Sequence, residues 1–214
     1  MKTAYIIITA LAIALAVVTY KLVETSSAEP HADAVTAATS KASSAAAIDN
    51  IMTRSSIRAY TSREVTPQQI DTLLRAAMAA PTARDCRPWK FVVITDRAIL
   101  DTIAASKPNF SMAAEAQAAI VVCGDMTKAM EGDGRDYWIQ DCSAASENLL
   151  LAANALGLGA VWCGVYPVAE RVTFVRSLLG LPSDLIPLNI IPIGYPKAEA
   201  TPKQKYDPAN IINR

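Results

Sequence analysis

Hydrophobic and polar residues recur with helical spacing in the stretch between Thr66 and Pro81. Thr66 and Gln69 match a capping box, and Pro67 stands at the first helical position, where its missing N–H costs nothing. The apolar positions, spaced by three or four residues, are Ile70, Leu73, Leu74, Ala77 and Met78. This pattern predicts a helix that begins after Thr66, buries one face and ends at Pro81.

Three later stretches also have the features of helices, and they cover 96–106, 138–156 and 169–179. The longest has an apolar stripe and is followed by Gly157, a residue that favours the turn after a helix. The stripe consists of Ala145, Leu149, Ala152 and Leu156. Because the leucines at 149–151 fall on several faces, we expect this helix to be buried on more than one side.

Four short segments rich in β-branched, aromatic and other apolar residues predict strands. They are Trp89–Thr95, Ala119–Cys123, Ala160–Cys163 and Leu188–Ile193, and Gly124 and Asp125 end the second of them. Because helices and strands alternate along the chain, the sequence predicts a domain that mixes helices with a sheet.

The N-terminal part of the chain has a different pattern. After a cationic start, residues 4–18 form an almost unbroken apolar run, and residues 24–47 are rich in Ala, Ser and Thr. The periodic pattern of a folded domain begins only after them. We therefore divide the 214-residue chain into a signal peptide or membrane anchor (1–23), a linker expected to be disordered (24–47) and one folded domain (48–214).

The apolar run permits two interpretations. About fifteen apolar residues followed by the small residues of Ser26–Ala28 fit a cleavable secretory signal. Extended through Thr19 and Tyr20, the run approaches the ~20 residues that span a bilayer, so it also fits an uncleaved anchor. Both interpretations predict an exported protein, periplasmic or membrane-anchored, whose only membrane contact is residues 4–20 if the signal stays uncleaved.

Charge and composition narrow the function. The sequence has 20 basic and 20 acidic residues and no basic block or stripe, so we expect no nucleic-acid partner. The single histidine, His31, lies in the linker and leaves the domain without histidine for catalysis or for a metal site. The four cysteines, which form no C-x-x-C pattern, are Cys86, Cys123, Cys142 and Cys163. Their even number permits disulfides in an exported protein, but Cys123 and Cys163 lie in apolar, strand-like runs, so we favour small buried thiols and expect no metal site.

Common enzyme motifs are absent from the sequence. The glycines of the Gly157–Gly164 stretch follow a helix and precede a strand, which is the reverse of the order in a dinucleotide-binding fingerprint. G-x-S-x-G, P-loop and H-E-x-x-H patterns do not occur. We therefore expect neither hydrolase nor kinase chemistry.

The run from Arg54 to Arg58 (RSSIR) is the first candidate binding site. On its own it fits either a solvated turn or a phosphate cradle, because guanidinium and hydroxyl groups donate to the several oxygens of a phosphate. The segments that follow it favour the cradle. They are APTARDCRPWKFVVI (80–94), QDCSAASENLLLAANALGLGAVWCG (140–164), IPIGYP and a lysine-rich tail.

In this order and spacing, the segments resemble the nitroreductase family of FMN-dependent oxidoreductases, over about residues 48–214. The resemblance implies an α+β, nitroreductase-like fold with a central mixed β-sheet flanked by helices. It also implies FMN as the cofactor, NADH or NADPH as the electron donor, and a homodimer with each FMN at the subunit interface.

The resemblance also implies contacts with the FMN phosphate, its ribityl chain and the flavin ring. The residues that match the phosphate and ribityl contacts are Arg54, Ser55, Ser56, Arg58, Lys203 and Lys205. Ser55 stands where the family usually has a second basic residue. Trp162, Cys163 and Gly164 match a backbone shelf beside the flavin, where a glycine lets the main chain approach a flat ring.

The stretch from Pro81 to Trp89 departs from the family pattern P-S-x-x-N-x-Q-P-W, whose Asn and Gln lie near the flavin ring. Thr82 takes the position of the Ser, and Asp85 and Arg87 replace the Asn and the Gln. A carboxylate can accept a hydrogen bond from the flavin N3–H but cannot donate one as an amide does. Two arrangements stay open: Asp85 and Arg87 could pair with each other, or Arg87 could donate to a ring carbonyl.

We therefore expect an enzyme that transfers hydride from NAD(P)H through flavin N5 to a nitroaromatic, a quinone or a similar small acceptor. Because the cofactor carries the chemistry, the protein needs no catalytic side chain of its own. Three alternatives stay open: a flavin-dependent reductive dehalogenase of the same fold, a protein that binds flavin without turnover, and a scaffold that has lost its cofactor. Asp85 is the only hint of the last.

Overall fold

The computed structural model describes Lys21 and residues 45–214. The chain divides into two units, 1–48 and 49–214, and the second contains the sheet and helices α3 to α6. The predicted signal or anchor and the linker lie outside the described residues, apart from Lys21 and 45–47. Within the described part of the chain, no helix is long and apolar enough to cross a membrane.

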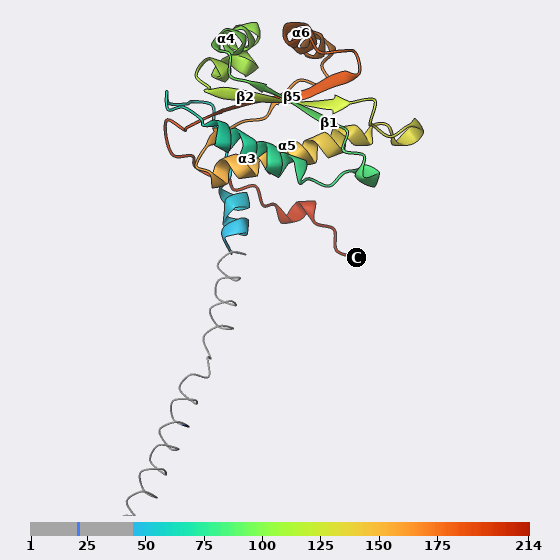
Figure 1. The fold of residues 1–214 in the computed structure, drawn as a ribbon. Coiled ribbons are helices and arrows are strands. Elements are labelled where there is room, and N and C mark those ends of the chain that lie inside the picture. The colour runs from blue at the N-terminus through green and yellow to red at the C-terminus, as the bar shows by residue number, and fades with distance from the viewer. Residues whose placement is uncertain (1–20, 22–44) are drawn as a thin grey trace, which may run out of the picture. The chain divides into compact units, whose positions relative to one another are not determined.

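A five-stranded sheet forms the centre of the second unit (Figure 1). Its strands are β1 (Trp89–Ile94), β2 (Ala118–Asp125), β3 (Gly159–Ala160), β4 (Cys163–Gly164) and β5 (Leu185–Gly194). The strand order is β1-β2-β5-β3, and β4 also pairs with β5.

The expectation of a mixed sheet is wrong for these strands, because each of their pairs is antiparallel. The parallel pairing in the described residues is a single bridge between Ser56 and Ala160. Between β1 and β2 the chain passes through α4 (Arg97–Ser106) and the 3-10 segment η2 (Pro108–Ala114) and then returns in the opposite direction. A helix between two strands therefore does not produce a parallel pair here.

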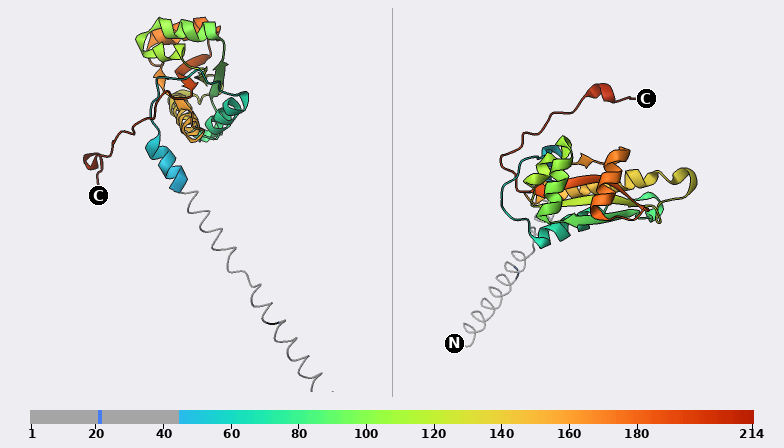
Figure 2. Two further views of the ribbon diagram at one scale, coloured as in Figure 1. Left: turned by 90° about the vertical axis from the view of Figure 1, so that its left-hand side faces the viewer. Right: turned by 90° about the horizontal axis from the view of Figure 1, so that it is seen from above.

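Helices cover both faces of the sheet (Figures 1 and 2). α3 (Pro67–Met78) and α5 (Tyr137–Ala155) lie on one face, and α4 and α6 (Ala169–Leu179) lie on the other. β2 is buried along its whole length, and its side chains point alternately into two hydrophobic cores. Residues 118, 120 and 122 face α3 and α5, whereas residues 119, 121 and 123 face α4 and α6. Burial on both faces explains why this strand is an uninterrupted apolar run in the sequence.

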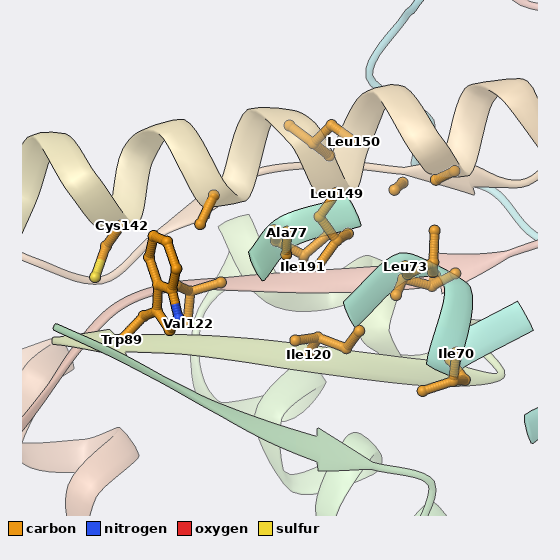
Figure 3. Packing of buried hydrophobic residues seen from close by; sticks show 14 of the residues in the cluster. Ile70, Leu73, Ala77, Trp89, Ile120, Val122, Cys142, Leu149, Leu150 and Ile191 are labelled. Atoms are coloured by element: carbon orange, nitrogen blue, oxygen red, sulfur yellow. The ribbon is translucent and has the colours of Figure 1, made fainter. Parts of the chain in front are cut away.

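The core between α3, α5 and the sheet is shown in Figure 3. Leu73 and Ala77 of α3 and Leu149 of α5 are fully buried against Ile120 and Ile191 of the sheet. Burying a leucine or isoleucine of this kind stabilises a fold by about 1.5–3 kcal/mol relative to leaving it exposed. Leu150 is buried in the same core, whereas Leu151 is only half-buried, so the expectation that α5 is buried on more than one side stays a prediction.

The expected helices are confirmed, with corrections at their ends. α3 has both hydrogen bonds of the predicted capping box, and Asp96 caps α4. Gly180 follows α6 with a left-handed φ of 60°. Two expected core residues are wrong: Met78 is 52% exposed and Leu156 is 37% exposed, because each lies at the end of its helix.

Two strand predictions also need correction. β2 continues through Gly124 and Asp125, since Gly124 pairs with Trp89 and leaves room for the ring of Trp138. A Cβ atom on Gly124 would lie 2.3 Å from a carbon of that ring. The expected strand 160–163 is interrupted at Val161 and Trp162, although β3 and β4 pair with β5 in one continuous register.

The four cysteines are free, and all except Cys86 are buried. Burial raises the pKa of Cys163 to about 11 and that of Cys123 to about 12, so both thiols stay protonated at neutral pH. The interpretation of Cys123 and Cys163 as buried apolar residues is therefore confirmed, and Cys142 is buried as well.

Candidate functional site

The Arg54–Arg58 segment is attached to the sheet at β3. Ser56 forms a bridge with Ala160, and the backbone N–H of Ile57 donates to the carbonyl of Ala160 at 3.0 Å. Gly159 permits this approach, because a Cβ atom there would lie 2.6 Å from the side chain of Ile57. The candidate phosphate cradle thus lies next to the strand that leads directly to the predicted shelf.

The end of the domain pairs with the same segment. Thr61 N–H donates to the carbonyl of Tyr195 at 2.8 Å, and Lys197 N–H donates to that of Ala59 at 3.1 Å. At Gly194 a Cβ atom would lie 2.9 Å from Tyr60, so glycine is needed for this close approach. These contacts bring the tail after Lys197 to the Arg54–Arg58 segment.

A cavity of about 940 Å³ lies between these two parts of the chain, and we call it the anion cavity. Residues 51–59 and 197–206 line it. It brings together all six residues matched to the phosphate and ribityl contacts, which are Arg54, Ser55, Ser56, Arg58, Lys203 and Lys205. With Lys197, five basic side chains line the cavity, against a single acidic one, Glu199.

The basic residues of the anion cavity differ in how their charge is compensated. Arg54 forms a salt bridge with Glu147 at 3.2 Å, and Lys197 forms one with Glu115 at 2.6 Å. Among the carboxylates of the described residues, none forms a salt bridge with Arg58, Lys203 or Lys205. The cavity therefore carries uncompensated positive charge, which suits an anion such as a phosphate monoester.

A second cavity of about 400 Å³, which we call the ring cavity, adjoins the first at Arg58, since that residue lines both. One wall is the shelf, residues 161–164, and the opposite wall consists of Pro108, Asn109, Ser111 and Met112 from η2. A Cβ atom on Gly164 would meet nothing within 4 Å, so this glycine borders open space. A bare backbone edge beside an open cavity fits a flat ring system placed against the main chain.

No pattern in the sequence indicates the η2 wall. Its polar residues Asn109 and Ser111 belong to no motif, and only Pro108 marks the end of a helix. This wall contacts the shelf directly, because Met112 Sδ lies 3.5 Å from Cys163 Sγ. Contacts of this kind join segments about fifty residues apart and leave no local pattern.

The Thr82–Arg87 loop lies apart from this arrangement. Thr82, Asp85 and Arg87 line neither cavity. Arg87 donates twice to the carboxylate of Asp85, at 2.7 and 2.6 Å, so the structure adopts the arrangement in which the two side chains pair. Hydrogen bonds from Arg87 hold the pKa of the Asp85 carboxyl below its usual range, and the pair therefore stays charged at neutral pH.

The backbone of this loop is unusual. Arg84, Asp85 and Arg87 have φ values of 51°, 56° and 48°, which non-glycine residues rarely adopt. Asp141 of α5 accepts a hydrogen bond from Ala83 N–H at 2.9 Å, and Thr82 Oγ1 accepts one from Arg87 N–H at 3.2 Å. Asp141 thus anchors the loop to α5.

Comparisons with known proteins identify the family. The model of the Nitroreductase family matches residues 51–107 and 100–195. A provisionally named NADH dehydrogenase/NAD(P)H nitroreductase of Methanothermobacter thermautotrophicus is 45% identical over 165 residues, which cover 77% of this chain and 84% of the relative.

Solved structures agree with this match. A protein with the same provisional name from Parabacteroides distasonis is 49% identical, with a TM-score of 0.74, over 78% of this chain and 96% of that one. A provisionally named nitroreductase from Desulfovibrio desulfuricans, solved in complex with FMN, is 29% identical, with a TM-score of 0.68, over 78% and 96% of the two chains. The family match covers both the Arg54–Arg58 segment and the shelf. The chain therefore belongs to the nitroreductase family.

Proposed function

We propose that the protein is an FMN-dependent oxidoreductase that uses NADH or NADPH to reduce a nitroaromatic, a quinone or a similar small acceptor. The observation that carries this proposal is the junction of the two cavities at Arg58, with uncompensated positive charge on one side and the bare edge of Gly164 on the other. FMN has a matching shape, because its phosphate and ribityl chain extend from one end of a flat ring. The names of the relatives and the FMN complex of the Desulfovibrio protein support the same cofactor and electron donors.

In this proposal the residues of the anion cavity bind the phosphate and the ribityl chain. Arg58, Lys203 and Lys205 supply charge that no described carboxylate offsets, and Ser55 and Ser56 supply hydroxyl donors. Trp162, Cys163 and Gly164 support the flat ring from one side. Bound FMN supplies the hydride chemistry, and the protein supplies binding, orientation and exclusion of water.

A second copy of the chain completes the proposed site. Thr82, Asp85 and Arg87 match family residues near the flavin but line neither cavity of their own subunit. We propose that they reach the flavin of the partner in a homodimer. Exposed apolar side chains beside the anion cavity, such as Ile51, Met52 and Tyr206, support a partner that covers this region.

The N-terminal segment remains part of the proposal on sequence grounds. Residues 1–23 would direct export or anchor the protein, residues 24–47 would link that segment to the domain, and the enzyme would work in the periplasm or at a membrane. Fractionation of cells that express the full chain tests this, since a protein found only in the cytosol would contradict export.

An absorption spectrum of the protein as purified tests the central proposal. A band near 450 nm, about where oxidised flavins absorb, is expected, and NADH or NADPH should bleach it under anaerobic conditions. A spectrum without flavin, together with failure to bind added FMN, would identify a scaffold that has lost its cofactor. A flavin band that neither nucleotide bleaches would identify a binding protein, and turnover confined to halogenated aromatics would identify a reductive dehalogenase.

A further inference from the structure

The start of α6 touches both walls of the ring cavity. Arg171, the third residue of the helix, donates from Nη1 to the carbonyl oxygen of Gly164 on the shelf at 2.9 Å. The Cζ atom of the same guanidinium lies 5.9 Å from the ring centroid of Phe110, which is buried in η2 behind the opposite wall. One side chain therefore joins two walls whose sequences are more than fifty residues apart.

The neighbour of Arg171 reinforces this connection. Glu170 forms an ion pair with Lys107, the residue that directly precedes η2. The first turn of α6 thus contacts the shelf through Gly164 and the start of η2 through Lys107 and Phe110. Neither contact involves the anion cavity, so this attachment is independent of the residues expected to bind the phosphate.

Arg171 also places a charge beside the ring cavity. It is half-buried, and among the carboxylates of the described residues none forms a salt bridge with it, because Glu170 is paired with Lys107. Arg58, which lines the cavity itself, is the other cation at this place. This guanidinium, held against the carbonyl of Gly164, lies close enough to the shelf to raise the electrostatic potential at a group bound there.

We propose that Arg171 is a positioning residue for the flavin ring, an inference that rests on the proposed FMN function. It fixes the orientation of the Gly164 peptide and the separation of the shelf from η2. Its charge favours the reduced flavin, which is the more negative of the two redox states. Arg171 itself does not line the ring cavity and touches no reacting group.

The experiment compares variants of the full-length, FMN-loaded protein by redox titration and by flavin titration of the apoprotein. In Arg171→Gln the affinity for reduced relative to oxidised FMN should fall roughly three- to tenfold, a decrease in two-electron potential of about 15–30 mV. Arg171→Lys retains the charge and should remain near the wild-type potential. Arg176→Gln is the matched control, because it removes the same charge from the last turn of α6, where none of the described hydrogen bonds joins Arg176 to the shelf.

Each outcome decides between the proposal and its alternatives. A wild-type protein without flavin would overturn the proposed function itself. If the wild type binds FMN, an unchanged potential in Arg171→Gln, or an equal decrease in Arg176→Gln, would overturn the role of Arg171. Arg171→Met keeps the aliphatic stem against Phe110 and serves as a second neutral variant. If neither neutral variant folds, Arg171 belongs to the stability of the fold and the proposal is wrong.

Discussion

The two groups of residues matched to the flavin are held by different kinds of interaction. Backbone hydrogen bonds fix the Arg54–Arg58 segment, through Ile57 to β3 and through Ala59 to the chain after β5. Side chains fix the Thr82–Arg87 loop, through Asp141 and through the exposed Asp85–Arg87 pair, on a backbone with three positive φ values.

This difference divides the candidate site into two parts. One subunit builds the Arg54–Arg58 segment and the shelf by itself, whereas its Thr82–Arg87 loop is exposed and available to a partner subunit. Backbone pairing forms whenever the sheet forms, so the Arg54–Arg58 side of the anion cavity and the shelf are organised before any ligand arrives. The loop keeps its charged side chains in solvent, where they compensate each other and contact neither cavity. The predictions below measure how strongly FMN depends on each part, from the largest expected effect to the smallest.

The largest effect is expected from Gly164→Val. The new side chain would enter the ring cavity, where a Cβ atom meets no protein atom within 4 Å. We expect FMN affinity to fall about hundredfold or more, which corresponds to roughly 3 kcal/mol of steric cost. The apoprotein should unfold within about 1 kcal/mol of wild type, because the residue is at a sheet position with room around it.

For Gly164→Val, fluorescence titration of the apoprotein with FMN gives the FMN affinity, and denaturant unfolding of the apoprotein gives its free energy of unfolding. Normal FMN affinity would mean that the flavin does not lie against the shelf. A strongly destabilised apoprotein would mean that Gly164 serves the fold.

Removal of Arg58 is expected to have the next largest effect. Arg58→Ala should weaken FMN binding about ten- to hundredfold, which corresponds to the roughly 1.5–3 kcal/mol of a charge-assisted hydrogen bond. Arg54→Ala should cost less, because Glu147 already compensates part of the charge of Arg54.

Lys128→Ala is the control for these two variants, since it removes a surface charge outside both cavities. Calorimetric titration of the three apoproteins gives the order of affinities. Equal affinity in all three would assign both arginines to a solvated turn, the alternative that the isolated motif allowed.

A smaller effect is expected at the loop. Asp85→Asn removes a carboxylate whose charge Arg87 already compensates, so the flavin potential should rise by less than about 30 mV. Hydride transfer from NAD(P)H should become correspondingly faster. Redox titration of Asp85→Asn, Arg87→Gln and the double variant separates the two charges.

The direction of the change is the decisive result for Asp85→Asn. No change in any of the three loop variants would place the loop away from the flavin of both subunits. A lower potential in Asp85→Asn would contradict the electrostatic argument, because loss of a negative charge cannot favour the oxidised flavin.

The smallest effect is expected from a chain shortened to begin at Ala45. Both parts of the site belong to residues 49–214, so the shortened protein should be soluble and should bind FMN with wild-type affinity. Thermal unfolding should remain cooperative, with a midpoint close to that of the full chain. Aggregation or a much lower midpoint would show that the domain begins earlier than the sequence pattern indicates.

Local chemistry explains which parts of the fold could be predicted from the sequence. The capping box at Thr66 and the apolar run of β2 depend on neighbouring residues, and the structure confirms both elements. The candidate phosphate residues could be proposed from the sequence because the Arg54–Arg58 run is compact and resembles a known family. The interruption of the strand at Val161 depends on pairing with distant residues and has no local pattern.

Two kinds of feature could not be predicted: contacts between segments that are far apart in the sequence, and positive φ values at residues other than glycine. The three positive φ values of the Thr82–Arg87 loop occur at arginine and aspartate, where no glycine or asparagine marks them. The η2 wall and Arg171 meet the shelf only in three dimensions, through contacts with Cys163 and Gly164. Family resemblance supplied names for the shelf residues but did not indicate the residues that hold the shelf in place.

The anion cavity can form only after Lys197 has paired with Ala59. These residues stand near opposite ends of the folded unit, and the tail that carries Lys203 and Lys205 reaches the anion cavity only after they meet. The cation cluster therefore stays incomplete until residues 197–205 have been synthesised and have paired with the Arg54–Arg58 side. If FMN binds here as proposed, its binding is expected only after both ends of the folded unit have paired.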